Sequence, residues 1–132
     1  MMLVMNETDA YRLHALLELA ASFPEPLTAA EIARRRAVPA RFLARLLGEL
    51  AHEGLVATTR GPRGGVRLAV SPEGVRVASL VRPEPVPETG GVAVTWLARR
   101  LAGARAEALE PVTLADLVRL EREAYATASF DI

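Results

Sequence analysis

The stretch Gly54–Val70, GLVATTRGPRGGVRLAV, places a short glycine-rich tip between two runs that are typical of β-strands. Leu55–Arg60 is rich in β-branched residues, and apolar side chains alternate with others over Val66–Val70. An alternation of period two is the pattern of a strand that buries one face. The two runs therefore predict a β-hairpin.

The tip of this hairpin is small and cationic. Arg63 lies within it, Arg60 flanks it, and Pro62 stiffens its first corner. The positive backbone dihedrals of a tight turn are expected at three glycines, Gly61, Gly64 and Gly65. A slim tip of this kind can bring a guanidinium group to another surface without a collision of its backbone.

Two amphipathic segments precede the hairpin. Thr8–Phe23 carries leucines at helical spacing, which predicts a first helix that ends before Pro24 and Pro26. Thr28-Ala-Ala-Glu31 fits a capping box, in which the threonine oxygen and the glutamate side chain accept hydrogen bonds from free backbone amides. The short helix that follows is expected to bury Ala29, Ile32 and Ala33, and to point Arg34, Arg35 and part of Arg36 outward.

A third helix is expected to run from Pro39, in its first turn, to about Glu53, with Gly54 closing it. Its apolar face consists of Phe42, Leu43, Leu46, Leu47 and Leu50. The opposite face carries Arg41, Ala44, Arg45, Gly48 and His52. Three helices followed by a hairpin predict a winged helix-turn-helix, in which the third helix enters the major groove of DNA and the hairpin is the wing.

The wing has two interpretations. An arginine at its tip can enter the minor groove or lie along the phosphates of double-stranded DNA. Alternatively, the tip is only a well-formed turn, and the domain is an adaptor that binds protein rather than specific DNA. Salt-dependent binding to a promoter-length duplex distinguishes the two.

Charge is distributed unevenly along the chain, although its sum is zero. Residues 28–67 carry eight arginines and three glutamates, a net +5, whereas residues 83–132 carry five arginines and eight acidic residues, a net −3. All 16 basic residues are arginine, whose forked guanidinium suits phosphate and guanine. The basic segment contains the expected third helix and wing, which favours a nucleic-acid partner.

Composition argues against several other classes of protein. The absence of cysteine excludes disulfides, thiolate nucleophiles and cysteine-held zinc or iron–sulfur sites within this chain. His14 and His52, the only histidines, lie in different expected helices, so no metal site or cofactor is expected. Asp116 and Glu121 are further acid–base residue types, but no nucleophile motif or phosphate-binding loop accompanies them, so no enzyme is expected.

The sequence also predicts a protein of the cytoplasm. No apolar run approaches the roughly 20 residues of a membrane-spanning helix. The first residues, MMLVMNETD, lack the basic start and long apolar stretch of a signal peptide.

The last third of the chain indicates assembly. The segment Pro83–Gly91 is rich in proline and glycine, which predicts an extended, mobile linker. After it, apolar residues repeat at the spacing of a coiled-coil seam: Val94, Leu97, Leu101, Ala104 and Ala108. Such a stripe packs either on its own domain or on a second copy of the chain.

A final helix is expected after this stripe. Glu110-Pro111 should end the long helix, and Thr113 should cap the last one. The last helix is expected to turn Leu114, Leu117 and Val118 inward.

Three segments resemble a family of bacterial dimeric winged-helix regulators that includes the iron–sulfur-cluster, nitric-oxide and cysteine-metabolism repressors. They are AYRLHALLELA (10–20), LTAAEIARRRAVPARFLARLLGELAHEGLVATTRGPRGGVRLA (27–69) and VTLADL (112–117). The most restrictive feature is the FLxxLLxxLxxxGLV run that leads into RGPxGG. The resemblance implies a transcriptional regulator, expected to be a repressor, that binds a pseudopalindromic operator as a homodimer through a long helix that crosses to the other subunit.

Three departures from the family pattern limit this transfer. Cluster-sensing members carry three cysteines after the wing, whereas Pro83–Gly91 has none, which excludes cluster sensing. Ala44 stands where many members have glutamate, so their operator sequence cannot be carried over. Pro39 stands where serine is frequent, which removes a hydroxyl that could bind phosphate. The signal is therefore left open between a small-molecule effector, a partner protein and simple repression.

The combined prediction is a mainly α protein with a small β-hairpin. Residues 1–82 form the winged helix-turn-helix domain, 83–91 the linker and 92–132 a helical dimerisation region. The residues expected to contact DNA are Thr28, Pro39, Ala40, Arg41, Ala44, Arg45, Arg60, Gly61, Arg63, Gly64 and Gly65.

Overall fold

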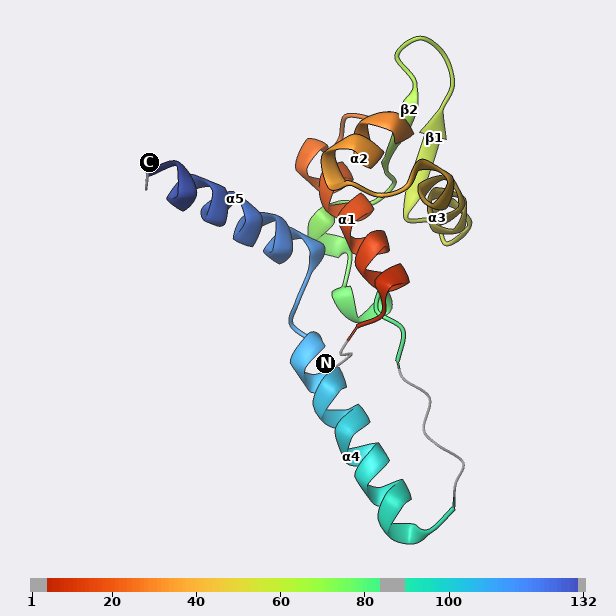
Figure 1. Cartoon of the computed structure of the whole chain (residues 1–132), viewed down its shortest axis with the longest axis vertical. Coiled ribbons are helices and arrows are strands. Elements are labelled where there is room, and N and C mark those ends of the chain that lie inside the picture. The colour runs from red at the N-terminus through yellow and green to blue at the C-terminus, as the bar shows by residue number, and fades with distance from the viewer. Residues whose placement is uncertain (1–4, 84–89, 131–132) are drawn as a thin grey trace.

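A computed structural model describes residues 5–83 and 90–130 (Figure 1). The elements follow in the order α1 (Glu7–Ser22), α2 (Ala29–Arg36), α3 (Ala40–His52), β1 (Val56–Thr59), β2 (Gly65–Leu68), the 3₁₀ turns η1 (Pro72–Gly74) and η2 (Val77–Ser79), α4 (Val92–Leu109) and α5 (Leu114–Phe130). This order confirms the expected winged helix-turn-helix with further helices. The two 3₁₀ turns were not expected.

The helix starts are fixed by side chains close to them in the sequence. Thr28 and Glu31 form the expected capping box of α2, with Glu31 N–H donating to Thr28 Oγ1 at 3.1 Å. Thr113 caps α5 in the same way, because Asp116 N–H donates to Thr113 Oγ1 at 3.2 Å and Thr113 N–H donates to Asp116 Oδ2 at 2.9 Å. Local sequence therefore sets where these two helices begin.

One core is formed by α1, α2, α3, both strands, η2 and α5, and among the described residues α4 packs against it only through the partly buried Leu109 at its end. Its fully buried side chains come from α1, α2, α3, β2, the turn after η2 and α5: Leu16, Leu19, Ile32, Leu43, Leu46, Leu50, Leu68, Leu80 and Leu114. The apolar face expected for the third helix is thus buried, with Phe42 half-buried at its edge. Among the described elements, α1 supplies the largest share of the buried hydrophobic side chains.

The wing is attached directly to the start of α2. β1 and β2 pair antiparallel from Val56↔Leu68 to Thr59↔Gly65. On the other side of β2, Leu27 N–H donates to Val66 O at 2.8 Å, and Val66 N–H donates to Leu27 O at 2.7 Å. The residue before the Thr28 cap is therefore part of the same ladder, which fixes the base of the wing relative to the helix-turn-helix.

The glycines of the wing have different roles. Gly61 and Gly65 have φ values of +113° and +155°, as expected. The expectation for Gly64 was wrong, because its φ is not positive. Its restriction is steric, since a Cβ there would lie 2.2 Å from the Thr59 carbonyl oxygen.

Replacing Gly64 with alanine is expected to open the hairpin and to destabilise the protein by about 1–3 kcal/mol, because the backbone must move to admit the methyl group. Gly74→Ala is the matched control, since a Cβ at Gly74 meets nothing within 4 Å. Urea unfolding of both variants measures the effect. Equal stability of the two variants would contradict the steric role of Gly64.

Four smaller expectations were also wrong. Ala29 is exposed, because the first turn of the short helix α2 projects beyond the core that Ile32 reaches. Pro39, with φ −56° and ψ 129°, is the N-cap of α3 and not part of its first turn. Val70 is 40% exposed, because β2 ends two residues before it. Arg36 does not point outward, and its contacts are described below.

The two C-terminal helices differ in how they meet the rest of the chain. α5 begins against the core, where Leu114 N–H donates to Val75 O at 2.9 Å and Val77 N–H donates to Val112 O at 3.0 Å. α4 extends away from the body and has no buried residue (Figure 1). Most of the expected linker, residues 84–89, lies outside the described residues. Within the described part of the chain, no helix is long and apolar enough to cross a membrane.

Candidate nucleic-acid interface

The outward face of α3 presents the cations that the sequence predicted. Arg41, Ala44 and Arg45 are exposed, whereas Leu43 and Leu46 beneath them are fully buried. The Arg45 guanidinium carbon lies 5.0 Å from the centre of the Phe42 ring, a cation–π contact that braces the side chain and leaves it at the surface. The core therefore holds α3 rigidly while its arginines stay accessible.

The wing presents a second set of the residues predicted to contact DNA. Arg60, Gly61 and Arg63 are exposed at its tip, while Gly64 and Gly65 are half-buried. A Cβ on Gly65 would lie 2.5 Å from the Leu27 carbonyl oxygen, so this glycine allows the wing to sit closely against the start of α2. Thr28, Pro39 and Ala40 are exposed at the starts of α2 and α3. In Figure 1 the hairpin projects from the body at the end opposite the free start of α4.

The arginines divide into paired and unpaired groups. Within residues 5–83 and 90–130, the arginines in ion pairs with carboxylates are Arg12, Arg35, Arg36 and Arg119. None of the four arginines predicted to contact DNA, Arg41, Arg45, Arg60 and Arg63, has such a partner among the described residues. Unpaired, solvated cations attract a polyanion without first breaking an internal ion pair.

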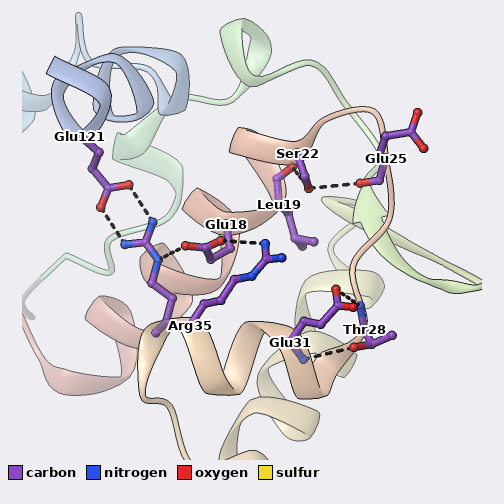
Figure 2. A network of polar contacts seen from close by, with 9 residues as sticks. Glu18, Leu19, Ser22, Glu25, Thr28, Glu31, Arg35 and Glu121 are labelled. Atoms are coloured by element: carbon purple, nitrogen blue, oxygen red, sulfur yellow. Dashed lines mark hydrogen bonds and ion pairs between the residues drawn. The ribbon is translucent and has the colours of Figure 1, made fainter. Parts of the chain in front are cut away.

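Arg36 belongs to the paired group. Its Nη1 and Nη2 donate to the two carboxylate oxygens of Glu121 on α5, both at 2.7 Å, and its Nε donates to Glu18 of α1 at 2.7 Å. Figure 2 shows Glu18 and Glu121 converging from their two helices. Only 10% of the Arg36 side chain is exposed. Arg36 therefore joins α1, α2 and α5, and we name these contacts the Arg36 clamp.

The clamp shifts the pKa values of both Arg36 and Glu121. Hydrogen bonds to Glu121 raise the pKa of Arg36 above its already high ordinary value. Hydrogen bonds from Arg36 lower the pKa of Glu121 below its ordinary value of 4.5. His14 lies at the edge of the clamp, with Nδ1 3.3 Å from Arg36 Nη1. Both charges of the Arg36–Glu121 pair are thus maintained at neutral pH.

A second buried arginine secures the far end of α3. Arg12 of α1 is 3% exposed, donates to Glu53 at 2.7 Å and lies 3.7 Å from Glu49. One turn earlier, Asp9 is 1% exposed and accepts the backbone N–H of Arg82 at 3.0 Å. The sequence prediction missed both residues, although two charged residues within a leucine-rich helix face were a signal that they have buried partners.

The predicted seam of α4 is uncovered in the single chain. Val94, Leu97 and Leu101 are 49%, 51% and 63% exposed, and Ala104 and Ala108 are also exposed. Trp96 on the same helix is 61% exposed. An apolar stripe of this size on a helix with no buried residue is typical of a surface that another chain covers.

Together, the capped helix-turn-helix, the cationic wing and the uncovered long helix define the class of winged-helix transcriptional regulators. A family model described as an iron-dependent transcriptional regulator, Rrf2, matches residues 5–120. The chain belongs to the Rrf2 family. This assignment also confirms the expected resemblance to a family of transcriptional regulators.

Relatives and solved structures agree with this family. The chain is 45% identical over 76 residues to an Rrf2-like HTH-type regulator of Rhodobacter capsulatus, covering 54% of this chain and 51% of that protein, so it spans about half the length of this relative. It is 34% identical over 121 residues to an HTH-type regulator of Synechocystis, covering 81% and 82% of the two chains. The structure of T. potens IscR aligns with a TM-score of 0.82 at 27% identity, over 92% of this chain and 90% of that one. CymR, the global cysteine regulator of B. subtilis, aligns with a TM-score of 0.76 at 28% identity, over 90% and 98%.

The donor atoms of this chain do not fit the iron that the family description names. Cysteine is absent from the whole sequence. Among the described residues, no three histidine, aspartate or glutamate side chains gather in a way that could hold a metal ion. His14 lies beside the Arg36 guanidinium, an unfavourable neighbour for a second cation.

The purified protein is accordingly expected to be colourless and to bind DNA equally well with and without oxygen or reductant, because it has no thiol to oxidise. Absorbance spectra and duplex binding under anaerobic and aerobic conditions measure this. A visible cluster absorbance that survives chelation, or loss of binding in oxygen, would contradict it.

Proposed function

We propose that the protein is a sequence-specific regulator of transcription, acting as a repressor in the cytoplasm, that binds a pseudopalindromic operator on double-stranded DNA as a homodimer and without an iron–sulfur cluster. The observation that carries this proposal is the set of unpaired arginines on α3 and the wing. Arg35 and Arg36 also belong to the basic segment, but both form salt bridges with Glu18 and so do not face an external partner.

Each element has its own role in this proposal. α3 lies in the major groove, where Arg41 and Arg45 near its start reach base edges. The wing reaches the flanking minor groove or phosphates through Arg63, and Arg60 braces the loop nearer the strand. Thr28, Pro39 and Ala40 lie close to the phosphate backbone at the two helix starts, where free backbone N–H groups favour anions.

The seam of α4 supplies the dimer. Val94, Leu97 and Leu101 lie on one side of α4, and Ala104 and Ala108 on the same side allow two helix backbones to approach closely. A two-fold dimer presents two copies of α3, which requires two half-sites related by the same symmetry. Residues 1–82 and 92–132 then serve as the DNA-binding and dimerisation parts, joined by residues 83–91.

Substitution of the arginines separates the two elements. Arg41→Ala and Arg45→Ala are each expected to weaken operator binding by about 1–3 kcal/mol and to relax base preference, if the lost contact is bidentate. Arg63→Ala is expected to weaken operator and scrambled duplexes alike, with a salt slope lower by about one for a phosphate contact, or to weaken mainly sites with a narrow minor groove. Arg60→Ala is expected to have the smallest effect of the four. Binding isotherms at several salt concentrations measure these changes.

Arg119→Ala is the matched control, because it removes one exposed arginine from α5, where Arg119 is paired with Asp116. It is expected to leave both affinities unchanged. If the four variants on α3 and the wing bind both duplexes as the parent does, the hairpin is not a DNA wing and the winged-helix adaptor takes the place of the proposed function.

A further inference from the structure

A groove lies where the C-terminal helices meet the winged helix-turn-helix. Its volume is about 810 Å³, within the range of sites that hold small molecules. Its walls come from the end of α1, from η1, from the turn after α4 and from α5. An occupant would therefore contact both the body that carries α3 and the helix that follows the α4 seam.

The wall of this groove is partly apolar. Ala20 of α1, Pro72 of η1 and Val118 of α5 line it and are buried. Phe23, just after α1, also lines the groove and is 37% exposed, so its ring is accessible to an occupant. These side chains offer a surface for an aliphatic or aromatic group.

The polar side chains of the groove leave one cation without a partner. Arg119 pairs with Asp116, and Glu73 accepts a hydrogen bond from the Ser71 hydroxyl. Arg122 of α5 lines the groove, is exposed, and has no hydrogen bond or ion pair among the described residues. One unpaired guanidinium matches one carboxylate, which it can bind with two parallel hydrogen bonds.

The charges of the groove also restrict the ligand. Glu73 and Asp116 carry lowered pKa values, because Ser71 donates to the first and the Thr113 backbone N–H donates to the second, so both are anions at neutral pH. The described lining holds two arginines, Arg119 and Arg122, against these two carboxylates, so it has no net positive charge to bind a dianion such as a phosphate monoester. A monoanion with an apolar body is the class that fits both the apolar wall and Arg122.

We propose that this groove binds a small monocarboxylate, whose aliphatic or aromatic body covers Phe23 and Val118 and whose carboxylate pairs with Arg122, and that its occupancy changes operator binding. The effect on operator binding rests on the proposed function, whereas ligand binding itself does not. The route from groove to α2 is short, because Val118 and Glu121 are one turn apart on α5 and Glu121 is held by the Arg36 clamp. A ligand that bridges α1 and α5 stabilises the docked position of α5.

The test uses 3-phenylpropionate as the probe, with 3-phenylpropanol as its uncharged analogue, in calorimetric titrations of the full chain. Saturable binding of the acid below about 10 mM is expected, with the alcohol binding about tenfold more weakly, the loss expected for one charge-assisted contact. Arg122→Gln is expected to remove the difference between acid and alcohol. Arg34→Gln is the matched control, because Arg34 is an exposed arginine of α2 with no ion pair among the described residues, and it should bind both probes as the parent does.

Three results would overturn this proposal. They are the absence of saturable binding, equal binding of acid and alcohol by the parent, and full retention of acid binding by Arg122→Gln. Duplex selection without any probe tests DNA binding independently of ligand binding in the groove, so it distinguishes failure of the proposed function from failure of the groove proposal. If duplexes are selected but the acid does not bind, the groove proposal alone fails, whereas failure to select any duplex removes the proposed function whatever the groove binds. If operator affinity is the same with and without saturating acid, occupancy of the groove does not change operator binding, and that part of the proposal is wrong.

Discussion

Replacing Leu101 with glutamate is expected to convert the protein from a dimer at micromolar concentration into a monomer. Leu101 is 63% exposed in the single chain. Full burial of a leucine side chain contributes about 1.5–3 kcal/mol to the free energy of association, and a two-fold dimer buries two copies of Leu101. Glutamate also places a charge in the seam, where it would lose its solvation. Because the two half-sites are then bound independently, operator affinity is expected to fall by at least about 100-fold.

Light scattering and operator binding measure this change. Ala106→Glu is the matched control, because Ala106 is an exposed alanine on the opposite side of α4, about half a helical turn from the seam. It should leave both the mass and the affinity unchanged. If the parent protein is monomeric at tens of micromolar, the apolar stripe of α4 is not a dimer interface. If a dimer persists in Leu101→Glu, the dimer interface lies elsewhere on the protein.

Arg36→Ala is expected to destabilise the folded protein by about 2 kcal/mol, because it leaves the carboxylates of Glu18 and Glu121 without their main partner. Glu121 loses both of its hydrogen bonds from Arg36, and Glu18, whose side chain is 17% exposed, keeps only the longer contact with Arg35. Urea unfolding at neutral pH measures the loss. Arg35→Ala is the matched control, because Arg35 is 45% exposed and reaches Glu18 only at 3.6 Å, and it should cost about 0.5 kcal/mol or less.

Acidification provides a second measurement of the same clamp. The pKa of Glu121 is lowered in the folded state, so its contribution to stability is fully present above its ordinary value of 4.5 and is lost as pH falls through the folded value. The stability difference between the parent and Arg36→Ala should therefore narrow below pH 4.5. A difference that stays constant with pH, or equal stability of Arg36→Ala and Arg35→Ala at neutral pH, would contradict the clamp.

The features that the sequence predicted are those with local causes. The Thr28–Glu31 capping box joins residues three positions apart, the cap Thr113 acts on the first turn of its own helix, and the alternation in β2 covers four residues. The outward face of α3 follows from helical period alone, so the exposure of Arg41 and Arg45 was predictable. Such features require no knowledge of which distant segments meet.

The features that the sequence did not predict depend on tertiary contacts. Helical period places Arg36 partly outward on α2, yet α5 covers it with Glu121, which is 85 residues away in the sequence. Arg12 reaches Glu53 across 41 residues in the same way. The sequence predicts a positive φ at Gly64, whereas the actual constraint is the nearby Thr59 carbonyl oxygen. The position of that carbonyl depends on the register of the hairpin, which the sequence pattern does not give. The groove beside Arg122 likewise exists only because α5 returns to the end of α1.

Selection of bound duplexes from a random pool tests whether this protein binds specific DNA as a two-fold dimer, because it requires specific binding and returns the symmetry of the site. We expect enrichment of a motif with two related half-sites, about one helical turn apart or a multiple of that spacing. Selection with Arg41→Ala and Arg45→Ala should then broaden base preference within each half-site. If the parent protein enriches no motif above the starting pool, it is not a sequence-specific DNA-binding regulator.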